Sequence, residues 1–170
     1  MARHTNSTAY FSEVASEAMA ALAADYQVPV RQTADGAFEL GVKDLAIVLY
    51  LYPGHVPSVN ISLLPLSDQW AGWRARSVWG RTGIWLQHLV AFRMPDTQFP
   101  PTRFTTREEL QTAVGALSRL LRVAAPDLLL GDLRDFDRIA AFADERVLRK
   151  QAEAKLVQVL SSAGRLRGSG

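Results

Sequence analysis

A chain of 170 residues with 48% hydrophobic and 21% charged side chains has the composition of an ordinary globular protein. This balance disfavours a disordered chain, a collagen-like repeat and a membrane bundle. The chain contains no cysteine, which excludes disulfides, thiolate metal sites and a cysteine nucleophile and fits a reducing compartment. A net charge of +2 is too small to indicate nucleic-acid binding by the molecule as a whole.

The first residues do not look like an export signal. Arg3 and His4 are followed by the polar stretch from Thr5 to Thr8, where a signal peptide needs apolar residues. The longest unbroken apolar run, residues 45–52, is far shorter than the roughly 20 residues of a spanning helix. We therefore expect a cytoplasmic protein without a membrane span.

The N-terminal region has helical periodicity. Apolar residues at steps of three and four predict an amphipathic helix over residues 8–25, capped by Asn6 or Ser7. The residues that set this periodicity are Phe11, Val14, Ala15, Ala18, Ala21 and Leu22.

Beyond Pro29 the period changes to two, which predicts short strands joined by tight turns. Asp35 with Gly36 marks the first turn, and Lys43 with Asp44 marks the second. Residues 45–52, LAIVLYLY, form an uncharged β-prone run that we expect in the centre of a sheet, because an uncovered edge there would promote aggregation. A further strand is expected over residues 58–64.

The second half of the chain begins with an ambiguous stretch. Alternation over residues 73–79 fits a strand or an irregular segment, and a short helix is expected from Thr82 onward, followed by a proline-rich loop over residues 94–104. Thr105 with Glu108, and Thr106 with Glu109, have capping-box spacing before a helix over residues 106–124. A last helix, capped by Asp132 or Asp135, is expected to run to about residue 160.

This order of elements predicts an α+β fold. We expect an antiparallel sheet of about four or more strands, with an N-terminal helix and two or more C-terminal helices packed on it. Residues 1–160 are expected to form one domain, and residues 161–170 a flexible tail because they lack apolar periodicity.

Catalytic and metal-binding patterns are weak throughout the sequence. His55 in the loop PGHVP has the chemistry of a general base, but there is no GxSxG elbow to receive it, so a polar loop residue is favoured. His88 stands 33 positions away, outside any short metal-binding spacing. The aspartates around Gly131 lack the EF-hand pattern and are interpreted as helix caps and helix-dipole partners; they are Asp127, Asp132, Asp135 and Asp137. We expect no enzyme, no metal and no cofactor.

The tetrapeptide Gly80-Arg81-Thr82-Gly83 resembles the GxxG loop of KH domains, which clamps nucleic-acid backbone between two helices. A chain with 11 glycines is expected to contain a GxxG pattern about once by chance, so this tetrapeptide does not carry an RNA-binding prediction by itself.

Charge and indoles concentrate in one segment. Residues 1–69 have a net charge of −4, residues 70–107 of +5 and residues 108–170 of +1, and all four tryptophans lie in the middle segment. Arginine and tryptophan together are typical of binding hot spots for a protein partner, and they also suit stacking on single-stranded nucleic acid. The alternative is that the indoles fill the core while the arginines face water. The candidate binding residues are Trp70, Trp73, Arg74, Arg76, Trp79 and Arg81.

The element order, together with the junction APDLLLGDLRDF at residues 125–136, resembles small immunity proteins of bacterial polymorphic-toxin loci. That resemblance implies a non-enzymatic inhibitor of one toxin partner and transfers no functional residues. The first 65 residues also resemble the secretion-chaperone fold, although those chaperones are commonly acidic and this chain is not. We therefore expect a binding protein of immunity or chaperone type that acts through a protein–protein interface; the alternative is a nucleic-acid-binding module that uses residues 70–93.

Overall fold

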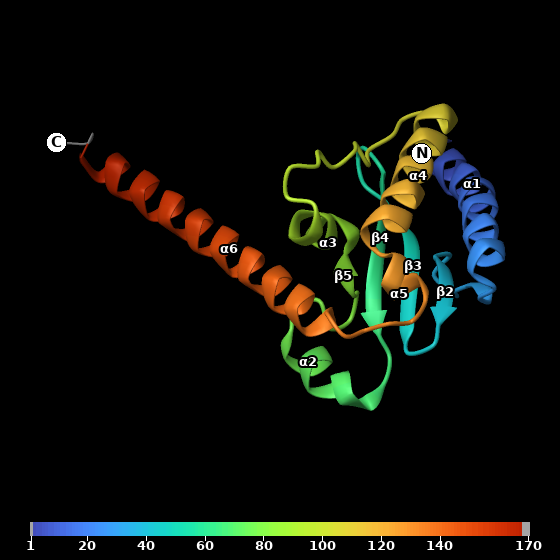
Figure 1. The fold of residues 1–170 in the computed structure, drawn as a ribbon. Helices are drawn as coiled ribbons and strands as arrows, with labels where there is room; N and C mark the ends of the chain where they lie inside the picture. Colours follow the sequence, from blue (N-terminus) through green and yellow to red (C-terminus); the bar gives the residue numbers. More distant parts are fainter. Residues whose placement is uncertain (1, 168–170) are drawn as a thin grey trace.

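The computed structural model describes residues 2–167, with side chains described for residues 10–156 and 158. Five antiparallel strands form one sheet in the order β1-β2-β3-β4-β5 (Figure 1). The strands are β1 (Val30–Gln32), β2 (Phe38–Val42), β3 (Leu45–Tyr52), β4 (Ser58–Pro65) and β5 (Ile84–Trp85). The helices are α1 (Ala2–Tyr26), the 3-10 turn η1 (Asp68–Trp70), α2 (Ala71–Arg76), α3 (Leu86–Arg93), α4 (Arg107–Ala124), α5 (Pro126–Leu129) and α6 (Phe136–Arg167). The predicted α+β fold class is confirmed.

The central position of β3 is also confirmed. All eight of its residues pair with β4, and residues 45–49 also pair with β2, so the first five residues of the run LAIVLYLY are covered on both edges. The two predicted turns join the first three strands. Gly36 has φ +85° in the first turn, and Lys43 has φ 51° in the second. Strand register is thereby fixed over the part of the chain that is most prone to aggregation.

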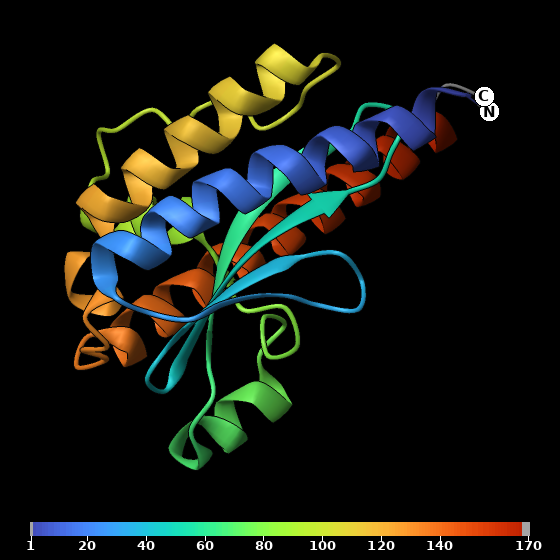
Figure 2. The same ribbon diagram turned by 90° about the vertical axis from the view of Figure 1, so that its right-hand side faces the viewer.

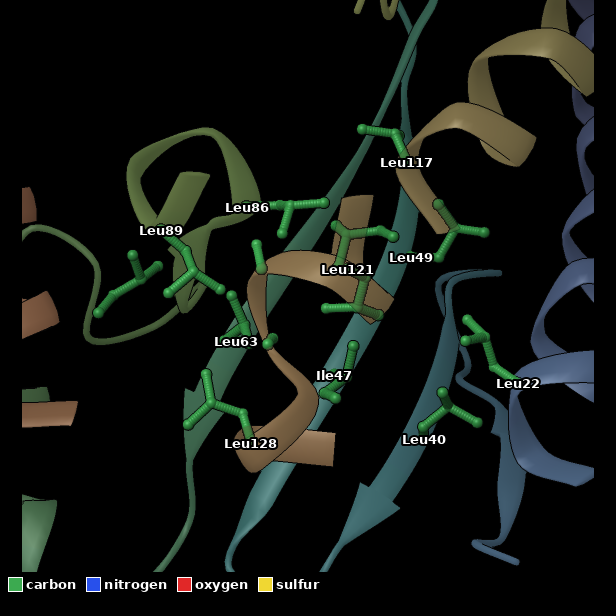
Figure 3. Packing of buried hydrophobic residues seen from close by; sticks show 14 of the residues in the cluster. Leu22, Leu40, Ile47, Leu49, Leu63, Leu86, Leu89, Leu117, Leu121 and Leu128 are labelled. Carbon is green, nitrogen blue, oxygen red and sulfur yellow. The ribbon is translucent and has the colours of Figure 1, made fainter. Parts of the chain in front are cut away.

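One face of the sheet carries the core. The helices α1 and α4 pack side by side over this face (Figure 2). Leucine and isoleucine side chains from the strands and the helices interdigitate there (Figure 3). Each fully buried side chain of this size contributes roughly 1.5–3 kcal/mol to stability. The labelled residues are Leu22, Leu40, Ile47, Leu49, Leu63, Leu86, Leu89, Leu117, Leu121 and Leu128.

The opposite face of the sheet is only partly covered. Because side chains alternate along a strand, the residues between the core positions point to this second face. Some of them keep part of their surface exposed, namely Glu39, Val48, Tyr50, Tyr52 and Leu64, whereas Ala46, Asn60 and Ser62 on the same face are buried. The sheet therefore has one sealed face and one that solvent reaches.

The segment after β4 differs from its prediction. Residues 71–76 form the helix α2 instead of a strand or an irregular segment, and the next helix begins at Leu86 instead of Thr82. The Arg74 guanidinium donates hydrogen bonds to the carbonyl oxygens of Pro65 (2.9 Å) and Ser67 (2.8 Å), which ties α2 back to the end of β4. This contact reaches back seven and nine residues, so local periodicity does not report it.

The last helix extends beyond its predicted end. The helix α6 continues through Arg167, over most of the segment predicted as a tail. The extension covers residues 161–167, which include two serines and Gly164, so the helix continues through residues of low helix propensity, where the sequence pattern predicts its end. Residues 168–170 of the predicted tail lie outside the described residues.

The predicted capping box at Thr106 is confirmed. The Thr106 hydroxyl accepts a hydrogen bond from the Glu109 backbone N–H (3.2 Å), and the Glu109 carboxylate accepts from the Thr106 backbone N–H (3.2 Å). The same carboxylate accepts from the backbone N–H of Thr105 (2.6 Å), and these bonds lower the pKa of Glu109. The start of α4, which covers the core, is thus fixed by local sequence.

Thr106→Ala removes the cap acceptor and is expected to lower the free energy of unfolding by about 1 kcal/mol. Urea denaturation at neutral pH measures this change. Thr106→Ser keeps the hydroxyl and serves as the control. An equal loss in both variants would contradict the assignment of the hydroxyl as the cap.

Candidate binding surfaces

Two of the three indoles in the predicted site are core residues. Trp70 is 7% exposed and Trp79 is 8% exposed, and Trp73 is half-buried. The rings of Trp70 and Trp73 pack edge-on against Phe136, with centroids 4.9 and 5.9 Å away. Phe136 is fully buried at the first turn of α6, so these indoles hold the base of that helix.

The three predicted arginines have different environments. Arg74 is half-buried and bonded to backbone carbonyls, as described above, whereas Arg76 and Arg81 are exposed. The structure therefore does not gather the six predicted residues into one exposed patch. Their binding role stays a prediction, and among the six only Arg76 and Arg81 present most of their side chain to solvent.

The GRTG segment has a structural use. A Cβ added at Gly80 would lie 1.8 Å from the Arg74 carbonyl oxygen. Gly83 has φ +78°, and a Cβ there would lie 2.7 Å from the Leu63 carbonyl oxygen. Both glycines allow backbone segments to approach closely. The segment joins α2 to a strand, β5, and not to a second helix as in the KH arrangement.

A row of aromatic rings crosses the second face of the sheet toward α3. Neighbouring ring centroids lie 4.7 Å apart for Tyr50 and Tyr52, 5.7 Å for Tyr52 and Trp85, 5.3 Å for Trp85 and Trp79, and 4.8 Å for Trp79 and His88. We call these five residues the ring row. The sequence signal for its first members is the period of two in LAIVLYLY, which places Tyr50 and Tyr52 on one face.

The ring row contains buried polar atoms without partners. The indole N–H of Trp79 and Nδ1 of His88 form no hydrogen bond, and the Trp85 N–H and the Ser62 hydroxyl lie beside the Tyr50 hydroxyl without a hydrogen bond of good geometry. The Tyr52 hydroxyl donates to the Tyr50 hydroxyl at 2.8 Å. Burial and the Tyr52 hydroxyl raise the pKa of Tyr50, while Ser62 and Trp85 partly oppose this shift. The row is polar as well as aromatic, which is unusual for a surface that is half-buried.

The helix α6 forms a projecting arm. Its 32 residues correspond to a length of about 48 Å. Its first turns are buried through Phe136, Ile139, Ala140 and Ala143, and beyond them it runs away from the rest of the chain (Figure 1). Residues 148–156 are all exposed. We call residues 148–167 the α6 arm.

The α6 arm exposes apolar side chains in one stripe. Leu148 is 63% exposed and Leu156 is 60% exposed, and with Ala152 between them they follow a spacing of four residues. An exposed apolar stripe on a helix is typical of a docking element. Sequence analysis missed the arm, because the pattern of a helix does not say whether its apolar stripe is covered.

The remaining candidates have ordinary structural environments. His55 is exposed in its loop. Asp127 receives a bidentate hydrogen bond from the Arg93 guanidinium at 2.5 and 2.6 Å; burial opposes ionisation, but Arg93 lowers the pKa of Asp127 overall. Asp132 and Asp135 pair with nearby arginines. Within the described residues, no group of three or more histidines and carboxylates is placed to hold a metal ion.

The remaining observations concern membrane-spanning helices and similarity to known proteins. Among residues 2–167, no helix combines the length and the apolar character that crossing a bilayer requires. The chain matches no protein-family model, no curated protein and no solved structure.

Gly80→Ala is expected to lower the free energy of unfolding by about 2 kcal/mol or more, because the new methyl group would overlap the Arg74 carbonyl. Gly72→Ala is the matched control: its nearest contact is the flexible end of Arg76 at 3.6 Å. In α2 the control should gain about 0.5–1 kcal/mol. Thermal and urea denaturation compare the two variants, and similar effects in both would contradict the close approach.

His88 should make stability depend on pH. Burial, followed by the positive charges of Arg146 and Lys150, lowers the pKa of His88 from 6.5 to about 4. The unfolded chain therefore takes up the proton first, so this contribution to stability is complete above pH 6.5 and is lost as the pH falls toward 4. The loss is expected to be roughly 2–3 kcal/mol.

Urea denaturation at several pH values between 4 and 7 measures this loss, and His88→Gln is the comparison. The variant should lack the His88 part of the pH dependence, whatever its stability at neutral pH. Parallel pH profiles for the two proteins would exclude a shifted His88.

Proposed function

We propose that this chain is a non-enzymatic binding protein, of immunity, inhibitor or chaperone type, whose α6 arm docks into an apolar groove of an acidic partner protein. The observation that carries the proposal is the projection of α6 with Leu148 and Leu156 about 60% exposed. Helices with such stripes commonly bind by laying their apolar face into a groove.

The distribution of charge supports an acidic partner. Residues 1–147 hold fourteen basic and sixteen acidic side chains, a net charge of −2, whereas residues 148–167 hold five basic side chains and Glu153, a net charge of +4. Two α6 arms laid against each other would bring like charges together, which is unfavourable. A groove rimmed with aspartate and glutamate would complement the arm and accelerate association.

The base of the arm supports a rigid presentation. Phe136 is held by Trp70 and Trp73, and Asp144 accepts a hydrogen bond from the Ser77 hydroxyl at 2.7 Å. The first turns of α6 therefore have a defined direction relative to the sheet. A preformed helix loses less conformational entropy on binding than a disordered segment does.

A photo-crosslinking residue at position 152, between Leu148 and Leu156, is expected to capture one acidic protein, with products of adjacent genes tested first. Calorimetry with the purified partner should then show that Leu148→Asp with Leu156→Asp weakens binding by roughly a hundredfold, because both apolar anchors are lost. Val123→Asp changes an equally exposed apolar residue on α4, 64% exposed, and should leave the affinity unchanged.

Three results would count against the proposal. The first is crosslinking at position 152 that yields only the chain itself. The second is a partner whose affinity survives the double substitution in the arm. The third is a catalytic turnover that depends on His55, which would make the chain an enzyme.

A further inference from the structure

We propose that the second face of the sheet binds single-stranded nucleic acid, with bases stacked on Tyr52 and Trp85 and phosphates held by Arg103, Arg146 and Lys150. This inference is separate from the proposed docking of Leu148 and Leu156, because it rests on the second face of the sheet, and it shares only Lys150 with the α6 arm. It also differs from the predicted site in residues 70–93, of which it keeps only Trp85.

The strand register assembles the stacking platform. Ser62 of β4 lies opposite Val48 of β3 on one side and opposite Trp85 of β5 on the other. Residues directly opposite each other share a face, so Trp85 lies on the same face as Val48, Tyr50 and Tyr52. The rings of Tyr52 and Trp85 are 5.7 Å apart, and both are half-buried. Sheet faces with such rings provide stacking surfaces for unpaired bases.

Cations flank the ring row at both ends. An isolated bridge pairs Ser58 with Arg103, and Ser58 is also opposite Tyr52, so Arg103 lies on the second face, across β4 from Tyr52. Arg103 is exposed and forms no ion pair within the described residues.

At the other end of the ring row, α6 packs against α3, where the ring centroids of Phe92 and Phe142 lie 5.4 Å apart, and the Arg146 guanidinium lies 5.7 Å from the Phe142 ring centroid. Lys150 follows one turn later on α6, and both charges act on His88.

Negative charge on this face is compensated. Among the strand residues that the structure describes, Glu39 is the carboxylate on the second face, and Arg31 pairs with it at 2.7 Å. A polyanion therefore meets cations at both ends of the ring row, and the α6 carboxylate linked to the row, Asp144, already accepts a hydrogen bond at 2.7 Å from the Ser77 hydroxyl, which itself accepts one from the Trp79 backbone N–H. Such an arrangement favours phosphates, as a basic surface with interleaved rings does in single-strand binders.

The buried polar atoms also favour a ligand with hydrogen-bonding edges. The Trp79 N–H is a buried donor without a partner, whereas the Trp85 N–H and the Ser62 hydroxyl lie beside the Tyr50 hydroxyl. Buried polar groups in folded proteins are nearly always paired, so the Trp79 donor favours a partner that carries an acceptor. Bases offer carbonyl and ring-nitrogen acceptors, and in a single strand these edges are free.

The two surfaces of α6 do not exclude each other. Lys150 lies about 200° around the helix from Leu148. Lys150 and the apolar stripe of the arm therefore lie on nearly opposite sides of α6. Arg146 lies near Lys150 on the helix surface, four residues earlier. A protein partner on the stripe would leave the ring row accessible.

Fluorescence anisotropy with a labelled oligo-dT of about 12 nucleotides tests the inference on the full chain. At about 50 mM salt we expect saturable binding. Tyr52→Leu should weaken it roughly tenfold, because a stacking ring is lost, and Tyr52→Phe should retain it. Tyr10→Leu, which removes a tyrosine exposed on α1, is the matched control and should have no effect.

The salt dependence separates phosphate contacts from stacking. Three phosphate contacts on a single strand predict a slope of about −2 for log affinity against log salt, and Arg103→Gln should reduce its magnitude by about 0.7. Because Arg103 is exposed, Arg103→Gln should fold. If Tyr52→Leu does not fold, Arg103→Gln still tests the inference. The double substitution in the α6 arm, Leu148→Asp with Leu156→Asp, should remain able to bind the oligonucleotide, which distinguishes this inference from the proposed function.

Several outcomes would overturn the inference. One is the absence of an anisotropy change at low salt. Another is equal binding by wild type, Tyr52→Leu and Arg103→Gln. Competition by polyglutamate of the same length as effectively as by unlabelled oligo-dT would show a general anion surface and would also overturn it. Competition by mononucleotides at concentrations as low as those of the oligonucleotide would assign the surface to a free nucleotide instead.

Discussion

The alternation of side chains on β3 determines the two surfaces of this molecule. Leu45, Ile47 and Leu49 point to one face, where they are fully buried beneath the helices, and Tyr50 and Tyr52 point to the other. Because β3 is paired along both edges, it cannot shift its register without breaking hydrogen bonds on two sides. The register of β3 therefore sets the positions of both the hydrophobic core and the ring row. A shift in this register would displace both.

The helix α6 depends on a second set of contacts. Phe136 packs against Trp70 and Trp73, which lie between β4 and β5 in the chain, and the buried face of α6 ends after Ala143. The indoles predicted as a binding site thus include two that anchor the projecting helix. Arginine and tryptophan are enriched in this segment for a structural reason: Arg74 and the indoles fasten α2 and the base of α6 to the sheet.

Positive and negative charges are unevenly distributed along the chain, although the net charge is small. The α6 arm is strongly basic, and residues 1–147 are slightly acidic. Several carboxylates of that larger part are already paired with arginines, including Glu13 with Arg107 and Asp25 with Arg122. Within the described residues, Arg146 and Lys150 on α6 form no ion pair, and neither does Arg103 at the other end of the ring row, so both proposed partners would meet positive charge.

Local sequence determined the parts of this protein whose interactions lie within a few residues along the chain. The turns at Gly36 and Lys43, the capping box at Thr106 and the two-residue period of β3 are of this kind, and the structure confirms each. Tertiary structure alone decided which apolar stripes are covered and which aromatic rings meet. Trp85 reaches Tyr52 because β5 pairs with β4 across a segment of more than twenty residues, and Leu148 stays exposed because nothing in the described chain packs over it. Periodicity records that a residue is apolar and which way it points, but burial depends on a second surface whose position is set by contacts far away in the sequence.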